Sequence, residues 1–206
     1  MTLPLRWIDP PTTSFVLRDA DRNTAWLYAS WTDREDISQY VRIAIIAAED
    51  QRFPDHYGLD FVELEKTLLQ QGGPKRGAST ITQQLIKNLY LWPEKSLIRK
   101  GLEAWLALAL ELFVPKQRIL ELYLNVVEFG SGVYGVGQAA PSFFQKTPAD
   151  VNRVEASLLA AVLPNPKKLR VDKPSSYVYE RAQDIRFGIG RLGGPAYLKR
   201  LQPATD

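Results

Sequence analysis

Residues 37–52 read ISQYVRIAIIAAEDQR, and their apolar side chains recur with the period of an α-helix. The apolar positions, three and four residues apart, are Ile37, Tyr40, Val41, Ala44, Ile45 and Ala48. This spacing places them on one side of a helix that packs against a core. The helix should end between Glu49 and Arg52, because Pro54 disfavours helical geometry just before it.

Two acids, Glu49 and Asp50, stand at the expected carboxyl end of this helix. The negative end of the helix dipole and the apolar surroundings both disfavour the ionised form of an acid there. Helices normally carry Lys or Arg at this end, so the two acids suggest a functional role. The alternative is structural: they cap a neighbouring helix or pair with Arg52.

A second helix is expected to begin at Ser79 or Thr80, with Gln83 completing a capping box. Its apolar face carries Ile81, Leu85, Ile86 and Leu89, and its polar face carries Ser79, Thr80, Gln83, Gln84 and Lys87. Free N–H groups at the helix start, preceded by Lys75 and Arg76, favour an anion such as phosphate. An ordinary solvated polar face is the alternative.

Glu103 lies four residues after Arg99, in the first turn of a helix expected at residues 96–114. There the helix dipole and the ion pair both favour its ionised form. Glu111 lies two turns further along. Two carboxylates in contrasting surroundings can divide acid–base work in glycosyl chemistry, although a surface ion pair would also explain Glu103. Together with the anion site, they suggest transfer from a glycosyl phosphate or pyrophosphate to a sugar hydroxyl.

The rest of the chain is expected to be mainly α-helical. Further helices are expected at residues 61–70, 116–127, 139–145, 147–163 and 176–192. A short N-terminal β-hairpin is expected where residues 15–17 and 26–28 flank a polar turn. Because the sequence contains no recognisable linker, residues 1–206 are expected to form a single domain. It would consist of an extended N-terminal segment 1–35, a helical catalytic core 36–166 and C-terminal helices 167–206.

The composition restricts the chemistry. The 206 residues include no cysteine and one histidine, which excludes disulfides, thiolate zinc sites and cysteine nucleophiles. His56 is expected to make structural hydrogen bonds, and the acids around it lack the spacing of a calcium loop. Residues 75–100 hold six basic residues and one acid, whereas residues 33–63 hold eight acids and three arginines. This asymmetry fits an anionic ligand bound beside carboxylates.

No secretory signal is recognisable at the start of the sequence. The most apolar run, residues 102–114, contains Glu103 and Glu111 and is shorter than the ~20 residues of a membrane span.

Five segments, in order, resemble the signature motifs of the peptidoglycan glycosyltransferases (glycosyltransferase family 51). They read EDQRFPDHYGLD (49–60), RGASTITQQLIKN (76–88), RKGLE (99–103), KQRILELYLN (116–125, continuing to residue 140) and EASLLAAVLPNP (155–166). The remaining chain is too short for a penicillin-binding transpeptidase domain. The resemblance is therefore to the stand-alone members, the monofunctional biosynthetic peptidoglycan transglycosylases.

This resemblance implies a lysozyme-like helical glycosyltransferase fold. It also implies polymerisation of lipid II into β-1,4-linked glycan strands, with inversion at the anomeric carbon and release of undecaprenyl pyrophosphate. The general base of the family falls on Glu49. The second carboxylate falls on Glu103, near the donor pyrophosphate, where a divalent cation (Mg²⁺ or Mn²⁺) is a candidate cofactor.

The resemblance also assigns substrate-binding roles, several of them to the polar helix face described above. The matching residues are Asp50, Arg52, Ser79, Thr80, Gln83, Gln84, Lys87, Asn88, Lys95 and Arg99. Lys95 stands where family members often carry arginine. Because lysine lacks the bidentate fork of arginine, its contact with the pyrophosphate is expected to be looser.

The implied partners are lipid II, the growing glycan, the membrane surface, phosphoglycolipid inhibitors of the moenomycin type and other cell-wall synthesis proteins, but not nucleic acid. An apolar membrane-facing surface is expected at residues 61–73. The implied location is the periplasmic face of a bacterial inner membrane. Family members normally carry an N-terminal transmembrane helix, so the native protein is expected to have an anchor that this sequence lacks.

Two other functions remain open at this stage. A lysozyme-like hydrolase or lytic transglycosylase would share the fold but would need no cationic site. A non-catalytic module could bind anionic lipid or nucleic acid through residues 75–100, although the aromatic residues there are not interleaved for base stacking. Replacing Lys87 or Glu49 distinguishes these functions from glycan polymerisation.

Overall fold

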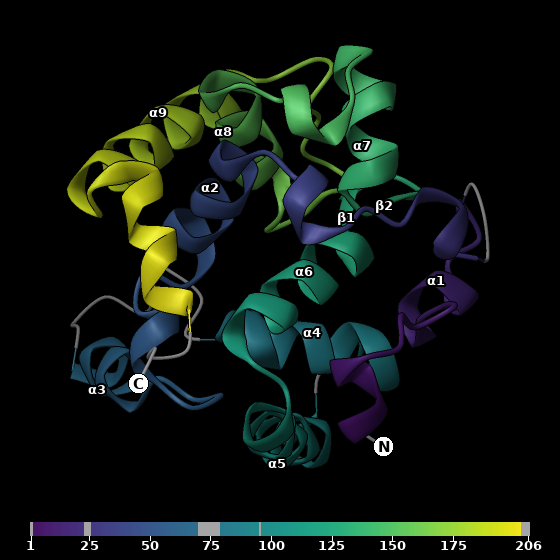
Figure 1. Cartoon of the computed structure of the whole chain (residues 1–206), viewed down its shortest axis with the longest axis vertical. Helices are drawn as coiled ribbons and strands as arrows, with labels where there is room; N and C mark the ends of the chain where they lie inside the picture. Colours follow the sequence, from purple (N-terminus) through teal and green to yellow (C-terminus); the bar gives the residue numbers. More distant parts are fainter. Residues whose placement is uncertain (1, 23–25, 70–78, 95, 203–206) are drawn as a thin grey trace.

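Helix α2 (Gln39–Glu49) lies to the left of the centre in Figure 1, and most of its residues are buried. The computed structural model describes residues 2–22, 26–69, 79–94 and 96–202. Helices α8 (Arg153–Val162) and α9 (Ser176–Arg191) and the 3-10 helix η6 (Gly194–Leu201) pack against α2. The sequence predicts one apolar stripe, but Val41 and residues 43–47 are all buried. Burial around most of its circumference identifies α2 as the core helix.

A second group of helices packs around α4 (Ile81–Tyr90). Its neighbours are α1 (Ser14–Arg18), α5 (Leu97–Phe113) and α6 (Lys116–Val126). The remaining α-helices of the described residues are α3 (Phe61–Leu69) and α7 (Val136–Phe144). The other 3-10 helices there are η1 (Leu3–Arg6), η2 (Tyr28–Ser30), η3 (Arg34–Asp36), η4 (Phe53–Asp55) and η5 (Pro148–Asp150). The mainly α fold class is confirmed.

Helix α4 starts as its sequence predicts. Thr80 Oγ1 accepts a hydrogen bond from the backbone N–H of Gln83 at 3.1 Å, and Gln83 Oε1 accepts one from the N–H of Thr80 at 3.0 Å. This reciprocal pair satisfies two N–H groups that the first turn would otherwise leave without partners. Ser96 and Ser175 similarly cap the starts of α5 and α9.

The predicted N-terminal β-hairpin is wrong. Residues 15–17 belong to α1, which Thr13 caps by accepting a hydrogen bond from the N–H of Val16, and Tyr28 begins η2. Val16 is fully buried, on a helix that packs against α4, so tertiary packing outweighs the β-propensity of this short run. The N-terminal segment is therefore not simply extended, since η1, α1 and η2 all lie within residues 1–35 and η3 begins there.

The one sheet of the described residues lies elsewhere. It pairs β1 (Glu128–Gly130) with β2 (Val133–Tyr134) in antiparallel fashion. In the turn between them, Gly132 has a φ of +73°, and a Cβ there would lie 1.9 Å from the carbonyl oxygen of Asp21. Only glycine allows this close approach, which joins the N-terminal segment to the sheet.

None of the described helices combines the length and the apolar character that crossing a lipid bilayer requires.

Candidate active site

A cavity of about 600 Å³ opens where the end of α2 meets the starts of α4 and α5, with α9 on one side. Both acidic and basic side chains line this cavity. The residues that line it are Ala48, Glu49, Asp50, Gln51, Arg52, Asp60, Glu63, Ser79, Thr80, Gln84, Lys87, Arg99, Lys100, Glu103, Leu163, Pro164, Tyr177 and Arg181. The cavity thus brings together residues from four helices that are distant in the sequence.

Glu49, the last residue of α2, is held by two side chains from different helices. Its Oε2 accepts a hydrogen bond from Gln84 Nε2 at 2.9 Å, and its Oε1 lies 3.4 Å from Arg181 Nη2. The side chain is 14% exposed, on the wall of the cavity. The carboxyl group is therefore fixed in direction and still reachable from the cavity.

Burial raises the pKa of the Glu49 carboxyl above its ordinary value. The hydrogen bond from Gln84 and the charges of Arg181 and Lys87 oppose this rise in pKa, while the charge of Asp50 adds to it. A carboxylate with a raised pKa is a stronger base once it is ionised. This agrees with the expectation that an acid at this helix end is reluctant to ionise.

Gln84 is itself oriented by a fully buried tyrosine. The Tyr123 hydroxyl donates to Gln84 Oε1 at 2.9 Å, so the amide nitrogen of Gln84 faces Glu49. Tyr123 comes from α6, and burial raises its pKa well above the ordinary value. A neutral hydroxyl that donates to the amide oxygen thus connects the core to the carboxylate of Glu49. Sequence analysis did not identify Tyr123 as a site residue.

Asp50 has a largely structural environment, as the alternative interpretation allowed. Its carboxylate accepts hydrogen bonds from the backbone N–H of Ile81 at 3.0 Å and from His56 Nε2 at 2.9 Å. The first of these bonds fixes the N-terminus of α4 to the end of α2. His56 is therefore a structural residue as expected, and its hydrogen-bond partner is Asp50.

Asp50, His56 and Asp60 offer three potential metal ligands within 4.8 Å of one another. Several of their ligand atoms already form hydrogen bonds, however, although His56 Nδ1 is buried without a partner. Asp60 Oδ1 accepts from Arg52 Nη1 at 3.1 Å and from the N–H of Glu63 at 3.0 Å, and His56 Nε2 faces Asp50. Arg52 lines the cavity and is held there by Asp60. The arrangement is that of a hydrogen-bonded network.

The polar face of α4 divides into structural and cavity-lining residues. Ser79, Thr80, Gln84 and Lys87 line the cavity, but Gln83 and Asn88 are buried outside it. Gln83 spends its side-chain oxygen on the capping box, and Thr80 Oγ1 donates to the carbonyl of Gly58 at 2.6 Å. The structure therefore does not place Gln83 or Asn88 where a ligand in the cavity could contact them. Lys95 lies outside the described residues.

Three basic side chains that line the cavity, Lys87, Arg99 and Lys100, form a cation cluster. Glu103, nearly fully buried, lies between two of them. Its Oε2 accepts from Arg99 Nη1 at 2.5 Å, and its Oε1 accepts from Lys100 Nζ. Lys100 Nζ also donates to Ser79 Oγ at 2.8 Å. One carboxylate among three cations leaves a surplus of positive charge.

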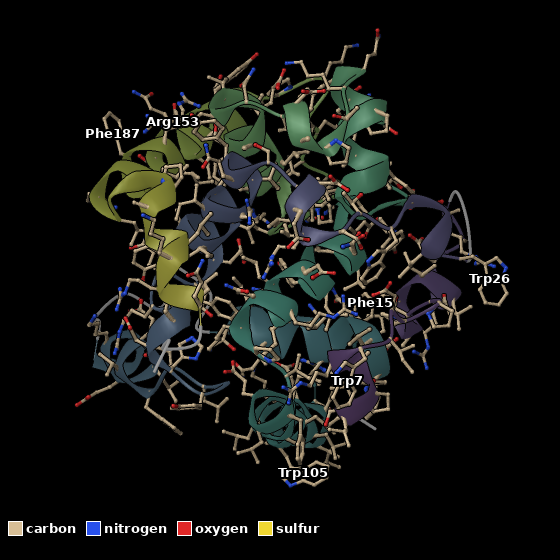
Figure 2. All side chains as sticks on the ribbon, viewed as in Figure 1. Trp7, Phe15, Trp26, Trp105, Arg153 and Phe187 are labelled. Carbon is tan, nitrogen blue, oxygen red and sulfur yellow. The ribbon has the colours of Figure 1, made fainter. Side chains whose placement is uncertain are left out.

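Lys87 has no carboxylate in direct contact among the described residues. Its ammonium lies 5.4 Å from the ring centre of Phe15, which is labelled in Figure 2. Burial lowers the pKa of Lys87, with the charges of Arg99 and Lys100 adding to this effect and that of Glu103 opposing it. An anion in the cavity would therefore relieve the repulsion within the cation cluster.

A divalent cation does not fit beside Glu103. Both of its carboxylate oxygens already accept from cationic side chains, and the surplus charge of the cation cluster would repel a further cation. The donor set matches a pyrophosphate better than Mg²⁺ or Mn²⁺, since those ions select carboxylate and water oxygens.

Tyr177 and Arg181 of α9 also line the cavity, and sequence analysis missed them, as it missed Lys100. Tyr177 and Arg181 are four residues apart and so share one helix face. Nothing local in a C-terminal helix tells which of its faces meets a site built from residues 49–103. Arg181 lies 132 positions from its partner Glu49.

Comparison with known proteins agrees with this geometry. The sequence profile of the family described as Transglycosylase matches residues 19–187. Relatives named biosynthetic peptidoglycan transglycosylase include one from Pseudomonas fluorescens, 44% identical over 208 residues, covering 98% of this chain and 87% of the relative. One from Xanthomonas axonopodis pv. citri is 46% identical over 205 residues (96% and 83%), and one from Xylella fastidiosa is 45% identical over 201 residues (94% and 83%).

These matches confirm the resemblance that the five motifs indicated. The family match covers the described cavity residues from Ala48 to Arg181. The chain is a member of the transglycosylase family, and it has the lysozyme-like helical fold of that family.

Proposed function

We propose that this chain is a peptidoglycan glycosyltransferase that polymerises lipid II into β-1,4-linked glycan strands, with residues 1–206 acting as a single domain. Its substrates are lipid II and the growing glycan chain. The cavity between α2, α4, α5 and α9 supports this proposal, because it combines the buried acid Glu49 with the cation cluster.

In the proposed reaction, Glu49 removes the proton from the 4-hydroxyl of the acceptor sugar of lipid II while that oxygen bonds to the anomeric carbon of the growing chain. The bond from this carbon to the pyrophosphate oxygen breaks with its electron pair, and undecaprenyl pyrophosphate leaves as an anion. Attack and departure occur on opposite faces of the sugar, so an α-linked donor becomes a β-linked product.

Lys87, Arg99 and Lys100 are the groups we assign to the leaving pyrophosphate. Negative charge grows on this group as its bond to the sugar breaks, and preorganised cations stabilise such charge most strongly in a partly buried site. Glu103 holds Arg99 and Lys100 through its two carboxylate oxygens. Its role in this proposal is to fix the cations rather than to bind a metal.

One observation carries the proposal: Glu49 and Lys87 line the same cavity. The charge of each affects the pKa of the other, which agrees with their proximity. A hydrolase acting on a sugar chain has no phosphate leaving group and no use for Lys87. A transferase acting on a glycosyl pyrophosphate needs both groups in one place.

A membrane surface is the natural location for a lipid-bearing substrate, and the exposed apolar side chains agree with it. On α3, Phe61, Val62 and Leu64 are exposed, in the segment that sequence analysis favoured. A larger apolar surface lies on α5 and the adjoining η1. We call it the α5 surface; it consists of Leu3, Trp7, Ile8, Leu97, Ile98, Leu102, Trp105, Leu108, Leu112 and Phe113.

The α5 surface begins close to the cation cluster, because Leu97 and Ile98 directly precede Arg99 on α5. Figure 2 shows Trp7 and Trp105 at the same end of the molecule. A pyrophosphate held by Arg99 and Lys100 could thus extend its lipid chain along this surface into a bilayer. Peptidoglycan synthesis takes place outside the cytoplasm, and we place this chain at the periplasmic face of the inner membrane.

The cation cluster is also the expected target of phosphoglycolipid inhibitors of the moenomycin type, since they carry a phosphate next to a sugar and a lipid. Other cell-wall synthesis proteins are expected to work beside this enzyme, and nucleic acid is not an expected partner.

The test is incubation of the protein with labelled lipid II in detergent, followed by sizing of the products. Wild type should form long glycan strands, and a phosphoglycolipid inhibitor should prevent this. Glu49→Gln should form none, with lipid II binding nearly unchanged, whereas Glu63→Gln, which replaces another acid of the cavity, should remain active. Cleavage of existing glycan without polymerisation would overturn the proposal.

A further inference from the structure

A second cavity, of about 650 Å³, lies at the other end of α2 from Glu49. Its walls come from η3, from the first turn of α2, from α6 and from η6. Its lining is Arg34, Glu35, Ile37, Gln39, Arg42, Gln117, Leu120, Glu121, Leu124, Pro195, Leu198, Lys199, Leu201 and Gln202. Arg42 and Glu49 are seven residues apart on the same helix, about 10 Å along its axis. The two cavities are therefore separate sites.

Arg42 is the unusual residue of this second cavity. It is partly buried, its Nε is buried without a hydrogen-bond partner, and among the described residues no carboxylate forms an ion pair with it. Burial lowers its pKa, and the neighbouring charge of Arg34 adds to this effect. An unpaired guanidinium in a partly buried position destabilises the fold unless a partner supplies negative charge.

The neighbouring charged residues do not supply that partner. Arg34 pairs with Glu35 and with Gln117, and Glu121 pairs with Arg118 outside the cavity. Glu35 affects Arg42 only through its charge, at longer range than an ion pair. Lys199 stands exposed beside the cavity, again with no ion pair within the described part of the chain. Arg42 and Lys199, neither of which forms an ion pair with a described residue, thus line the same cavity.

A parallel within the molecule supports a binding role for Arg42. Two arginine Nε atoms of the described residues are buried without partners, those of Arg42 and Arg181. Arg181 lines the candidate active site, and Arg42 lines the second cavity. Each cavity therefore has one guanidinium with unused hydrogen-bonding capacity.

The rest of the lining indicates the kind of ligand. Its floor is apolar: it consists of Ile37, Leu120 and Leu124, which are nearly fully buried, together with Pro195 and Leu198, which are half-buried. Its walls carry the side-chain amides of Gln39 and Gln202, which can pair with both the N–H and the C=O of a peptide backbone, and that of Gln117, whose oxygen already accepts from Arg34. Cations, amides and an apolar floor together match a peptide that carries a carboxylate and an apolar side chain. The volume lies within the range of typical ligand cavities.

We propose that the second cavity binds a peptide segment by its free carboxylate, with Arg42 as the main anchor and Lys199 as a secondary contact. This site is independent of glycan polymerisation, so it could place a partner protein or a peptide beside the enzyme without blocking the active site.

The test is a calorimetric titration of the intact chain with the peptide N-acetyl-Leu-Ala-Ala, as the free acid and as the carboxyl-terminal amide. The acid should bind about tenfold more tightly than the amide, because a charge-assisted hydrogen bond is lost in the amide. Raising the salt concentration should weaken binding of the acid. Equal affinity of acid and amide would overturn the proposal.

Three variants complete the test. Arg42→Gln should weaken binding of the acid about tenfold and Lys199→Gln about threefold, whereas Arg191→Gln, an exposed arginine outside the cavity, should have no effect. All three should polymerise lipid II at the wild-type rate. Full affinity in Arg42→Gln would overturn the assignment of the anchor. Acetate binding as tightly as the peptide would overturn the peptide assignment, since the amides and the apolar floor would then contribute nothing.

A stability measurement tests the same idea without a ligand. Because Arg42 forms no ion pair within the described part of the chain, Arg42→Met should unfold at the wild-type temperature or above it. A fall of about 3 °C or more would mean that the fold itself uses this guanidinium, and would overturn the proposal.

Discussion

The Tyr123 hydroxyl and the Gln84 side-chain oxygen lie 2.9 Å apart, and this contact determines which atom of Gln84 faces Glu49. An ionised carboxylate can only accept hydrogen bonds, so it needs the amide nitrogen of Gln84. With Tyr123 donating to the amide oxygen, the opposite orientation of the amide is disfavoured. Tyr123 therefore acts as a positioning residue that reaches Glu49 through Gln84.

Tyr123→Phe should lower the turnover number about tenfold and leave KM for lipid II nearly unchanged, because only the orientation of Gln84 is lost. Gln84 would then donate less reliably to Glu49, the pKa of Glu49 would rise further, and the acid side of the pH–rate profile would move to higher pH. Steady-state rates of lipid II polymerisation across the pH range provide the measurement.

Tyr134→Phe is the matched control for this variant. Tyr134 is also a buried tyrosine, and its hydroxyl donates to Asp19 at 2.7 Å, away from the cavity. This variant should lose a comparable amount of stability and keep the wild-type turnover and pH profile. If both variants lost activity equally, the effect of Tyr123 would be structural.

Arg181→Gln should shift the acid limb of the pH–rate profile upward, because the charge of Arg181 lowers the pKa of Glu49. Arg181→Lys keeps the positive charge and should retain most of the wild-type profile. The measurement is the pH dependence of kcat. An unshifted profile in Arg181→Gln would contradict the assignment of Glu49 as the base.

Glu49→Gln should be more stable than wild type at neutral pH and lose this advantage in acid. Because the pKa of Glu49 is raised in the folded chain, the folded state holds the proton more tightly. The contribution of Glu49 to stability is thus fully present below its unfolded-state pKa and is lost as the pH rises through the folded-state pKa. Thermal unfolding at several pH values measures the difference, which should be a few degrees at most. A variant less stable than wild type at neutral pH would contradict this.

Lys87→Met should lower kcat/KM for lipid II about 100-fold, because it removes a cation from the leaving-group end of the cavity. Burial lowers the pKa of this lysine, so a methionine of similar length should not destabilise the fold. Lys168→Met, which replaces an exposed lysine outside the cavity, is the control and should behave like wild type. Wild-type polymerisation by Lys87→Met would favour a role for the cavity other than pyrophosphate departure.

Trp105→Gln should reduce binding to vesicles of phosphatidylglycerol and phosphatidylethanolamine about tenfold, measured by flotation. Phe187→Gln is the matched control, since the two aromatic residues are 65% and 64% exposed and lie at opposite ends of the molecule (Figure 2). Equal losses in the two variants would argue against the α5 surface as the membrane contact.

Local sequence patterns predict the helices well, because caps and apolar periods lie within a few residues of each other. The capping box of Thr80 and Gln83 and the position of Glu49 at the end of α2 are both confirmed. The prediction of an N-terminal hairpin failed because a run of three apolar residues, such as residues 15–17, does not distinguish a strand from one helical turn. Val16 is buried against the rest of the fold, and this packing favours the helix over the strand.

The long-range contacts of the site could not be predicted in the same way. The sequence predicts that Asp50 binds a ligand, but its carboxylate accepts hydrogen bonds from His56 and from the backbone N–H of Ile81. The sequence pattern places Gln83 on a polar binding face, but its side-chain oxygen is used in the capping box of α4. Tyr123 and Arg181 lie near Glu49 only because α6 and α9 pack close to the end of α2. No local sequence pattern predicts this long-range packing.

Glu49 ends a helix that is buried around most of its circumference, and this has a consequence for how a polymer can grow here. If Glu49 is the base, as proposed, the base is attached to a buried helix and cannot travel with the chain end. After each addition the strand must therefore slide by one sugar unit past a stationary carboxylate, and the mobility that repeated synthesis demands has to come from the glycan and its lipid.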